Sequence, residues 1–401
     1  MERAAQLKRF VEHFRAGEKA PEEQAIGIEL EYLVLDGESL AAVPYSGQQG
    51  IADLLGCLVA KGWSPVWEEG HLIGAEKDGV SIALEPGAQL EVNFAPEESI
   101  GQIEDIYRRV LAEIVEILEE RGQILVALGY QPVTPIEQIS LLPRQRYRWM
   151  YTYLGTRGQS AHRMMKGTAA TQVCVDYTDE EDFRIKSRVI SFLTPFMYAV
   201  FDNASLYEGE VNHPVALRYR IWSDCDDDRC GYPKGIFTED YSYEKYAAYI
   251  LDSPALIVLK DGQLSYAGGE KPVKEYFDPE TFTDDELDYL LSMCFPDVRV
   301  RRYLEIRMAD SLPYPLNFGY VALWKGLLYD QFNLQRLYTE AREFGETALV
   351  GLRERVLRDG TQAAAGAFTV LERFQNYLEL AKGALSAAEL HYLAPIEEMV
   401  S

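Results

Sequence analysis

The sequence lacks the short motifs that mark the commonest nucleotide and acyl-transfer sites. Neither the phosphate loop Gly-x-x-x-x-Gly-Lys nor the dinucleotide fingerprint Gly-x-Gly-x-x-Gly occurs, which argues against a Walker-type or Rossmann-type nucleotide site. The nucleophile pattern Gly-x-Ser-x-Gly is missing as well. The five histidines are scattered, which disfavours a zinc hydrolase. Phosphate or acyl chemistry in this protein would therefore rest on other side chains.

Long apolar runs and regularly spaced cysteines are also missing. The run most like a membrane span, residues 189–201, is too short and is interrupted by Pro195. No charged and apolar leader opens the sequence. The five cysteines have no regular spacing, which is typical of free thiols in a reducing compartment. We therefore expect a cytoplasmic protein without a membrane partner.

Basic residues are scarce relative to acidic ones. The chain carries 39 Lys and Arg against 64 Asp and Glu, a formal charge of −25, so we expect no nucleic-acid partner. Residues 138–175 reverse this balance, because they contain no acidic residue. The basic residues of this acid-free segment are Arg144, Arg146, Arg148, Arg157, Arg163 and Lys166. Two interpretations stay open: a surface patch that pairs with acidic elements elsewhere, or a pocket for carboxylate or phosphate groups.

Helix-like and strand-like segments follow each other without the regular strand–helix–strand order of a parallel sheet. Residues 97–121 carry the clearest apolar stripe of a helix, and residues 317–401 are almost entirely helical in pattern. This order favours an α+β fold with a largely antiparallel sheet and surrounding helices. We also expect strands at residues 217–222 and 298–308. Residues 261–278 are expected to form a long loop, either a lid or a surface excursion.

Residues 27–33, GIELEYL, place two carboxylates side by side. Successive side chains of a strand point to opposite faces, so Glu29 and Glu31 share one face and their apolar neighbours occupy the other. Adjacent carboxylates repel each other more strongly as water is excluded, and a divalent cation such as Mg²⁺ removes that repulsion. An acidic edge strand that faces solvent is the alternative interpretation of this segment taken alone.

The segment 81–94, SIALEPGAQLEVNF, repeats this pattern. Pro-Gly turns the chain directly after Glu85, so this carboxylate lies at a bend. In the strand that follows, Gln89 and Glu91 share one face, while apolar residues occupy the other. A second pair of acidic residues in a hydrophobic frame shifts the balance from a solvated face towards a metal site.

Two further segments add polar residues to such a surface. Gln172 lies in a predicted strand at the end of the acid-free segment, and Glu305 and Arg307 share one face of the expected strand 298–308. Carboxylates that hold Mg²⁺ and arginines that hold phosphate are the components that phosphoryl transfer requires. The residues therefore favour a metal-dependent phosphoryl-transfer site.

Several motifs, in the same order along the chain, resemble the plant and proteobacterial type of glutamate–cysteine ligase. They lie between about residue 27 and about residue 330 and are ELEY, EPGAQLEVNFAP, LGYQP, MMKGTAATQVCVDY, RIWSDCDDDRCG and RYLEIRMAD. That family is related to glutamine synthetase. The resemblance implies an antiparallel sheet cupped around ATP and two or three Mg²⁺ ions, with Mn²⁺ as a possible substitute. We expect one ligase domain over residues 1–401, with a catalytic core over about 25–330.

The resemblance also implies an activity. It is the ATP-dependent ligation of the γ-carboxylate of L-glutamate to the amino group of L-cysteine through γ-glutamyl phosphate, a first step of glutathione or related thiol biosynthesis. The implied partners are small molecules, and the chain is expected to be a monomer or a homodimer.

Individual roles follow from the same resemblance. The residues that look like metal ligands are Glu29, Glu31, Glu85, Glu91 and Glu305. The cations that look placed for phosphate oxygens and the acyl phosphate are Arg307 and Arg229. The residue similar to the one that holds the glutamate carboxylate is Arg144 or Arg146. The other positions expected near substrate are Gln89, Gln172, Gly167 and Cys174.

The chain departs from the family pattern near the expected substrate positions. Ala88 replaces a usual glycine, Gly167 a usual arginine and Cys174 a usual asparagine, and Ser311-Leu312 replaces a glycine pair. These changes leave the metal carboxylates intact but leave the identity of the acceptor amine open. We expect the acceptor to enter last, near Gly167 and Cys174.

Three alternatives accompany this hypothesis. The ligase could join glutamate to a different amine. A guanidine-kinase-like phosphotransferase would share a similar core, but the order of the ligase motifs disfavours it. A non-catalytic acidic binding protein would not need an acid-free basic segment beside a carboxylate face.

Overall fold

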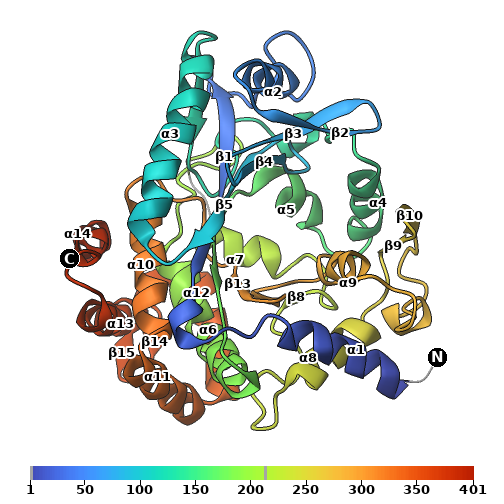
Figure 1. Ribbon diagram of the computed structural model, residues 1–401. Coiled ribbons are helices and arrows are strands. Elements are labelled where there is room, and N and C mark those ends of the chain that lie inside the picture. Colours follow the sequence, from blue (N-terminus) through green and yellow to red (C-terminus); the bar gives the residue numbers. More distant parts are fainter. Residues whose placement is uncertain (1–2, 212–214) are drawn as a thin grey trace.

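A nine-stranded sheet forms the centre of the computed structural model, which describes residues 3–211 and 215–401 (Figure 1). Its strands are β1 Ile26–Asp36, β2 Ser64–Glu68, β3 His71–Lys77, β4 Val80–Leu84, β5 Leu90–Glu97, β6 Gln123–Val126, β7 Thr171–Val175, β12 Val298–Val300 and β13 Leu304–Ile306. Their order is β12-β13-β7-β1-β5-β4-β3-β2, and β6 pairs with the second half of β1. Neighbouring strands all run antiparallel, which confirms the predicted fold class.

Three small two-stranded sheets lie outside this main sheet. They pair β8 Cys230–Gly231 with β11 Phe295–Pro296, β9 Ile257–Lys260 with β10 Gln263–Tyr266, and β14 Ala364–Ala365 with β15 Phe368–Thr369. Short 3₁₀ helices connect other elements at η1 Pro21–Glu23, η2 Ile136–Gln138, η3 Val273–Glu275, η4 Gly360–Gln362 and η5 Leu390–Leu393.

The α-helices surround the sheet unevenly. They are α1 Arg3–Arg15, α2 Ile51–Ala60, α3 Ile100–Glu119, α4 Gln145–Leu154, α5 Ala161–Gly167, α6 Glu180–Val200, α7 Leu217–Trp222, α8 Tyr243–Asp252, α9 Asp284–Leu291, α10 Leu316–Leu328, α11 Gln331–Phe344, α12 Glu346–Asp359, α13 Val370–Ala384 and α14 Ala394–Val400. Helices α2, α3 and α10 pack against the sheet, and α3 buries the apolar stripe that the sequence predicts. Figure 1 shows α3 and α10 on one side of the sheet and α4, α5 and α9 on the other.

Strand register gathers the polar residues onto one face of the sheet. Glu31 on β1 lies directly opposite Glu91 on β5, and Glu29 lies between Asn93 on β5 and Gln172 on β7. Residues that face each other across an antiparallel pair share a face of the sheet. The face predicted from alternation within single strands is therefore continuous across three of them.

The predicted strand at residues 217–222 is instead a helix, α7. The segment LRYRIW alternates apolar residues with arginines, a pattern that is also typical of a strand with one exposed face. The structure buries Arg218 together with its apolar neighbours and leaves Arg220 exposed. A short buried helix can carry an alternating pattern by chance, since six residues make fewer than two turns.

The predicted strand at residues 298–308 is two strands, β12 and β13, joined in a tight hairpin. Its consequence is that Arg299 lies directly opposite Glu305. The predicted loop at residues 261–278 begins with β10, which pairs with β9 in another hairpin. The helices α4 and α5 within the acid-free segment were not predicted.

The structure bears on two expectations from the sequence, the lack of a membrane-spanning segment and the free cysteine thiols. Within the described residues, no helix combines the length and the apolar character that crossing a bilayer requires. All five cysteines are free thiols, as their irregular spacing predicts.

Candidate active site

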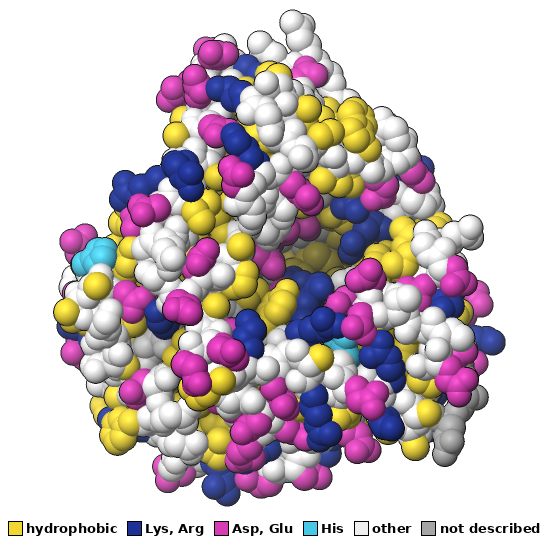
Figure 2. Space-filling model, viewed as in Figure 1, with side chains coloured by type: hydrophobic (Ala, Val, Ile, Leu, Met, Phe, Trp, Pro, Cys, Tyr) yellow, Lys and Arg dark blue, Asp and Glu magenta, His cyan; other side chains and the backbone are white. Residues whose placement is uncertain are grey.

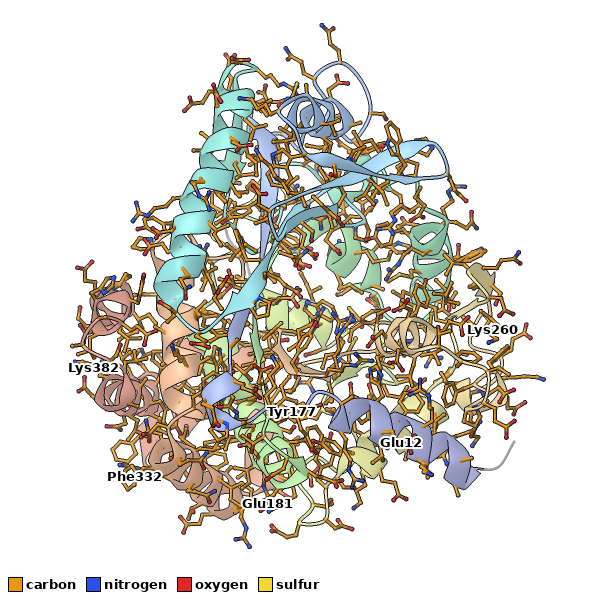
Figure 3. All side chains as sticks on the ribbon, in the orientation of Figure 1. Glu12, Tyr177, Glu181, Lys260, Phe332 and Lys382 are labelled. Atoms are coloured by element: carbon orange, nitrogen blue, oxygen red, sulfur yellow. The ribbon has the colours of Figure 1, made fainter. Side chains whose placement is uncertain are left out.

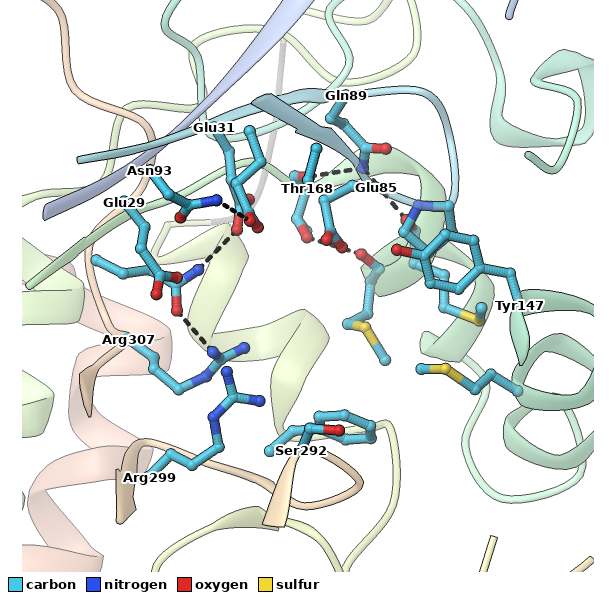
Figure 4. Close-up of a pocket in the computed structure, with 18 of the residues that line it drawn as sticks. Glu29, Glu31, Glu85, Gln89, Asn93, Tyr147, Thr168, Ser292, Arg299 and Arg307 are labelled. Carbon is cyan, nitrogen blue, oxygen red and sulfur yellow. Dashed lines mark hydrogen bonds between the residues drawn. The ribbon is translucent and has the colours of Figure 1, made fainter. Parts of the chain in front are cut away.

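The open face of the sheet holds a cavity of about 360 Å³, called the main cavity below. Strands β1, β5, β7 and β12 contribute to its lining, together with the β4–β5 turn and helices α4, α5 and α7. Figure 2 shows the hollow in this face of the molecule, with Lys and Arg side chains on its walls and Asp and Glu side chains at its edge. Figure 4 shows acidic residues on one side of the opening and arginines on the other.

Four glutamates form the acidic wall of the main cavity: Glu29, Glu31, Glu85 and Glu91. The Glu31 carboxylate accepts hydrogen bonds from the Ala170 backbone N–H and the Gln172 side-chain amide, each at 2.8 Å. Asn93 donates to Glu91 Oε1 at 2.7 Å. In the part of the chain that the structure describes, none of the four carboxylates forms an ion pair. Two neutral amides are thus the strongest side-chain donors that reach this wall.

Burial is the main reason why these carboxylates are hard to ionise. It raises the pKa of Glu29 to about 8, and repulsion by Glu305 and Glu91 adds to the increase. Burial likewise raises the pKa of Glu31, Glu85 and Glu91 to about 7, with repulsion between neighbouring carboxylates as a further cause. Like charges that face each other across strands are unfavourable, so the acidic wall requires positive charge.

The β4–β5 turn brings Glu85 into this wall. The Gln89 side chain accepts from the Gly87 backbone N–H at 2.8 Å and donates to the Thr168 carbonyl at 2.9 Å, which fastens the turn to the end of α5. A Cβ atom at Gly87 would lie 2.5 Å from the Lys166 carbonyl oxygen, so only glycine fits there. Ala88, which replaces the family's glycine, has φ of +66° in the left-handed region.

The arginine cluster, Arg299, Arg301 and Arg307, forms the opposite wall around Glu305. Arg299 donates to both Glu305 oxygens, at 2.6 Å and 3.1 Å, and Arg307 contacts the same carboxylate. Arg307 also donates to the Gln172 amide oxygen at 2.6 Å. Burial alone would raise the pKa of Glu305, but the three guanidinium groups outweigh it and lower the pKa to about 2.

Glu305 therefore differs from the other four predicted metal ligands. Its carboxylate is fully buried in ion pairs and is not part of the cavity lining, whereas the other four line the cavity. Three guanidinium groups share this one carboxylate, so the arginine cluster keeps excess positive charge. Such a cluster suits phosphate oxygens, which arginine binds through its planar fork.

The structure separates the two arginines between which the sequence could not choose. Arg144 is paired, because its Nε and Nη2 donate to Glu68 Oε2 at 3.0 Å and 2.7 Å. Arg146 lines the main cavity and its Nε is buried without a hydrogen-bond partner. Within the described residues no carboxylate lies at ion-pair distance from Arg146. Arg146 is therefore the one available to a carboxylate ligand.

Arg218 is a cavity residue that sequence analysis missed. It is only 4% exposed, and its Nε and Nη2 donate to the Arg307 backbone carbonyl at 3.3 Å and 3.1 Å. Its Nη1 is buried without a partner, although the residue lines the cavity. A buried, incompletely satisfied guanidinium indicates an anion site. The signal was an arginine between apolar residues, two positions before the motif RIWSDCDDDRCG, in a segment where the sequence predicted a strand.

Arg229 is not in the cavity lining, contrary to the role that the resemblance implied. It is 1% exposed, and it donates to Asp226 Oδ2 at 3.0 Å and to the Tyr153 hydroxyl at 3.1 Å. Backbone carbonyls of Met293 and Pro254 accept its remaining hydrogen bonds. The guanidinium nitrogens of Arg229 are thus all hydrogen-bonded within the protein. Arg229 connects buried segments of the chain, which corrects the predicted phosphate-binding position.

The two positions expected near the acceptor amine are not neighbours in the fold. Gly167 ends α5, where a Cβ atom would lie 2.5 Å from the Tyr130 ring, so the residue serves close packing rather than lining the cavity. Cys174 lies on β7 and lines a second cavity of about 240 Å³ together with Phe94 and Tyr303. We therefore correct the expectation that they form one acceptor position.

The basic residues of the acid-free segment divide between ion pairs away from the main cavity and positions in its lining. Arg157 forms ion pairs with Asp226 and Asp228 of the acidic loop after α7, and Arg163 lies 3.6 Å from Glu208. These two are basic residues paired with acidic ones elsewhere. Arg144 and Arg146, in contrast, line the main cavity.

The chemistry of the acidic wall fits a divalent cation such as Mg²⁺. Among residues 3–211 and 215–401, no three acidic, histidine or cysteine side chains converge closely enough to hold an ion by themselves. Mg²⁺ does not need such a cage, because it commonly binds one or two carboxylates and completes its shell with waters and substrate phosphates. Four carboxylates without ion pairs, of which Glu31 is buried and the other three are half-buried, lie at the edge of an open cavity and offer that kind of oxygen ligand.

Comparison with known proteins agrees with this chemistry. Residues 25–401 match the family model of glutamate–cysteine ligase family 2. The chain is 29% identical to glutamate–cysteine ligase B, chloroplastic, from Oryza sativa subsp. japonica, over 96% of this chain and 79% of that protein. It is also 29% identical to the chloroplastic glutamate–cysteine ligase of Arabidopsis thaliana, over 98% of this chain and 76% of that protein.

The fold is also similar to that of a solved structure. The glutamate–cysteine ligase of Francisella tularensis, in complex with AMP, superposes with a TM-score of 0.52 at 12% sequence identity. The match covers 94% of this chain and 82% of that chain.

Proposed function

The chain belongs to glutamate–cysteine ligase family 2, and from this premise we propose that it joins the γ-carboxylate of L-glutamate to the amino group of L-cysteine with hydrolysis of ATP to ADP and phosphate. The observation that supports this most strongly is the division of the main cavity. An acidic wall without ion pairs faces an arginine cluster with excess positive charge. Cation-bridged phosphates fit between two such walls.

The reaction needs activation of a carboxylate, because its oxygen is a poor leaving group. A γ-carboxylate oxygen attacks the γ-phosphorus of ATP, the bond from that phosphorus to the β–γ bridging oxygen breaks, and ADP leaves. The amine nitrogen then attacks the acyl carbon, phosphate leaves with the former carboxylate oxygen, and the nitrogen loses a proton. The protein must hold the acyl phosphate away from water until the amine arrives.

We assign the cavity residues to this reaction by charge. Arg307 and Arg299 would hold oxygens of the transferred phosphoryl group. Arg146 and Arg218, which have buried nitrogens without partners, would hold the α-carboxylate of glutamate. These four side chains keep the donor between the two walls, where donors fixed in advance stabilise charge as it develops.

Divalent ions would be held by Glu29, Glu31, Glu85 and Glu91. At one or two carboxylates per ion, these four accommodate the proposed two or three Mg²⁺ or Mn²⁺ ions. A bound ion supplies charge that neutralises the phosphates of the nucleotide.

The second cavity is the position we propose for the nucleotide base. It shares Glu29, Asn93 and Tyr303 with the main cavity, so phosphates beside the acidic wall would extend into it. Phe94 and Pro96 give this cavity apolar surfaces against which a planar base can pack. Monomer and homodimer remain equal predictions for the assembly.

The test combines a product assay with an isotope label. The protein is incubated with ATP, Mg²⁺ and glutamate labelled with ¹⁸O in the γ-carboxylate, and with cysteine, serine, alanine or glycine in separate reactions. We expect γ-glutamylcysteine in the cysteine reaction and one labelled oxygen in the released phosphate. Amide with unlabelled phosphate would overturn the acyl-phosphate route. An amide with another amine alone would replace cysteine as the acceptor, and no amide at all would overturn the ligase proposal.

A further inference from the structure

Helix α4 is a part of the main cavity wall that two hairpins hold from opposite sides. Its inner residues Arg146, Tyr147 and Met150 line the cavity. Figure 1 shows α4 between the β2–β3 hairpin and the β9–β10 hairpin. The orientation of this helix therefore decides where the Arg146 guanidinium lies.

Charged side chains hold α4 on the β2–β3 side. Arg144, directly before the first residue of α4, donates to Glu68 at the end of β2 through two nitrogens. Arg148, one turn further along, lies 3.8 Å from Glu69. These contacts are partly open to solvent, and exposed ion pairs of this kind contribute little to stability.

Aromatic rings hold α4 on the β9–β10 side. The Trp149 ring stacks on Tyr266 of β10 with centroids 5.8 Å apart and planes at 24°. One turn further along α4, Tyr153 packs so closely on Gly269 that a Cβ atom there would lie 2.4 Å from its ring. Figure 3 labels Lys260 at the far end of β9, and it shows side chains filling the space between this hairpin and α4.

Arg146 has few contacts of its own, although the next residue, Tyr147, donates to the Leu84 carbonyl at 3.0 Å. The Arg146 guanidinium lies 5.5 Å from the centroids of the Tyr147 and Tyr289 rings, and its Nε has no hydrogen-bond partner. Trp149 follows Arg146 by three residues, so the two lie on neighbouring positions of the helix surface. A small rotation of α4 after loss of the Trp149–Tyr266 stack would displace the guanidinium.

We propose that Trp149 and Tyr266 are positioning residues for the donor carboxylate: their ring stack holds α4 in the orientation that keeps Arg146 in the cavity wall. The proposal rests on the proposed function, in which Arg146 binds glutamate. It extends the substrate site to a hairpin whose own residues do not appear in the cavity lining, and it gives the segment 261–278 a role that the sequence left undecided.

The test compares Trp149→Ala and Tyr266→Ala with the conservative variant Trp149→Phe. Each alanine variant should raise KM for glutamate by about 10-fold or more, because displacements of about 1 Å can cost about 10²-fold. KM for ATP should change less than 2-fold, and Trp149→Phe should restore most of the glutamate affinity. The double variant should be no worse than the worse single variant, because both remove one contact.

Tyr314→Ala is the matched control. Tyr314 resembles Tyr266 in exposure, with 40% against 43% of its surface exposed. Its ring stacks on that of Tyr107 with centroids 5.7 Å apart and planes at 23°, close to the geometry of the Trp149–Tyr266 stack. Tyr314→Ala removes a stack of similar geometry away from the main cavity, together with the Tyr314 hydrogen bond to Glu104, so KM for glutamate should not change. Equal KM increases for glutamate and ATP, additive effects of the two alanine substitutions, or a glutamate effect in the control would overturn the proposal.

Failure of the proposed function can be distinguished from failure of this inference. If the unmodified protein forms no amide product, the same single and double variants are compared by the protection of the α4 backbone N–H groups from hydrogen exchange. Faster exchange across α4 in Trp149→Ala, Tyr266→Ala and the double variant alike would support the stack as the tether of α4. Unchanged exchange would overturn it whatever the activity.

Discussion

The two walls of the main cavity shift the pKa of a glutamate side chain in opposite directions. Glu91, which is half-buried, and Glu305, which is fully buried, are glutamates on strands of one sheet. The pKa of Glu91 rises to about 7, because burial and neighbouring carboxylates oppose ionisation, whereas three arginines lower the pKa of Glu305 to about 2. Burial disfavours the ionised form of a carboxyl group, and charged side chains nearby determine whether this penalty is offset within the chain.

Because of this difference, the two walls suit ligand groups of opposite charge. The carboxylates of the acidic wall form no ion pair among the described residues, so this wall suits a ligand that brings positive charge. The arginine cluster has more positive charge than its one carboxylate neutralises, so it suits a ligand that brings negative charge. A nucleotide with its divalent ions brings both.

The largest expected effect breaks the acidic wall. Glu91→Gln removes a charged oxygen ligand and should lower kcat by about 10³-fold or more, since the loss of metal-based charge stabilisation is worth several kcal/mol. It also relieves repulsion, so the variant should remain folded. Thermal unfolding with and without Mg²⁺ checks the cause: the ion should stabilise the variant less than the unmodified protein. Full activity of Glu91→Gln in excess chelator would end the metal-site proposal.

The next effect weakens the arginine cluster without changing its charge. Arg307→Lys keeps the positive charge but loses the planar guanidinium, whose Nη1 contacts both Glu305 and Gln172. We expect kcat to fall by about 10²- to 10³-fold, the typical cost of one preorganised donor, with a smaller rise in KM for ATP. Steady-state kinetics at varied ATP provides the measurement. A variant with normal kcat would show that Arg307 only supports the sheet.

The smallest expected effect sharpens the comparison at the cavity rim. Arg146 has no carboxylate partner, whereas Arg144 is paired with Glu68. Arg146→Lys should therefore raise KM for glutamate by about 10-fold, as one lost charged hydrogen bond of about 1.5–3 kcal/mol implies. The matched Arg144→Lys should change it less than about 3-fold. The reverse order of the two effects would transfer the carboxylate site to Arg144.

Much of the site follows from local sequence pattern. Alternation within β1 and β5 predicts the shared face of Glu29 and Glu31 and that of Gln89 and Glu91, because strand geometry turns alternate side chains to the same side. The motif order predicts the family, which the match over residues 25–401 confirms. It also predicts the antiparallel α+β fold that the strand pairing confirms.

Only the tertiary structure decided which charges meet. The hairpin between β12 and β13 places Arg299 opposite Glu305, and α7 buries Arg218 in a segment that was predicted to be a strand. The same packing withdraws Arg229 from the cavity and leaves Arg146 open within it. The physical reason is the separation along the chain over which each effect acts. Side-chain alternation depends on adjacent residues. The pairing and pKa of a buried charge depend on partners that the fold brings from distant parts of the chain.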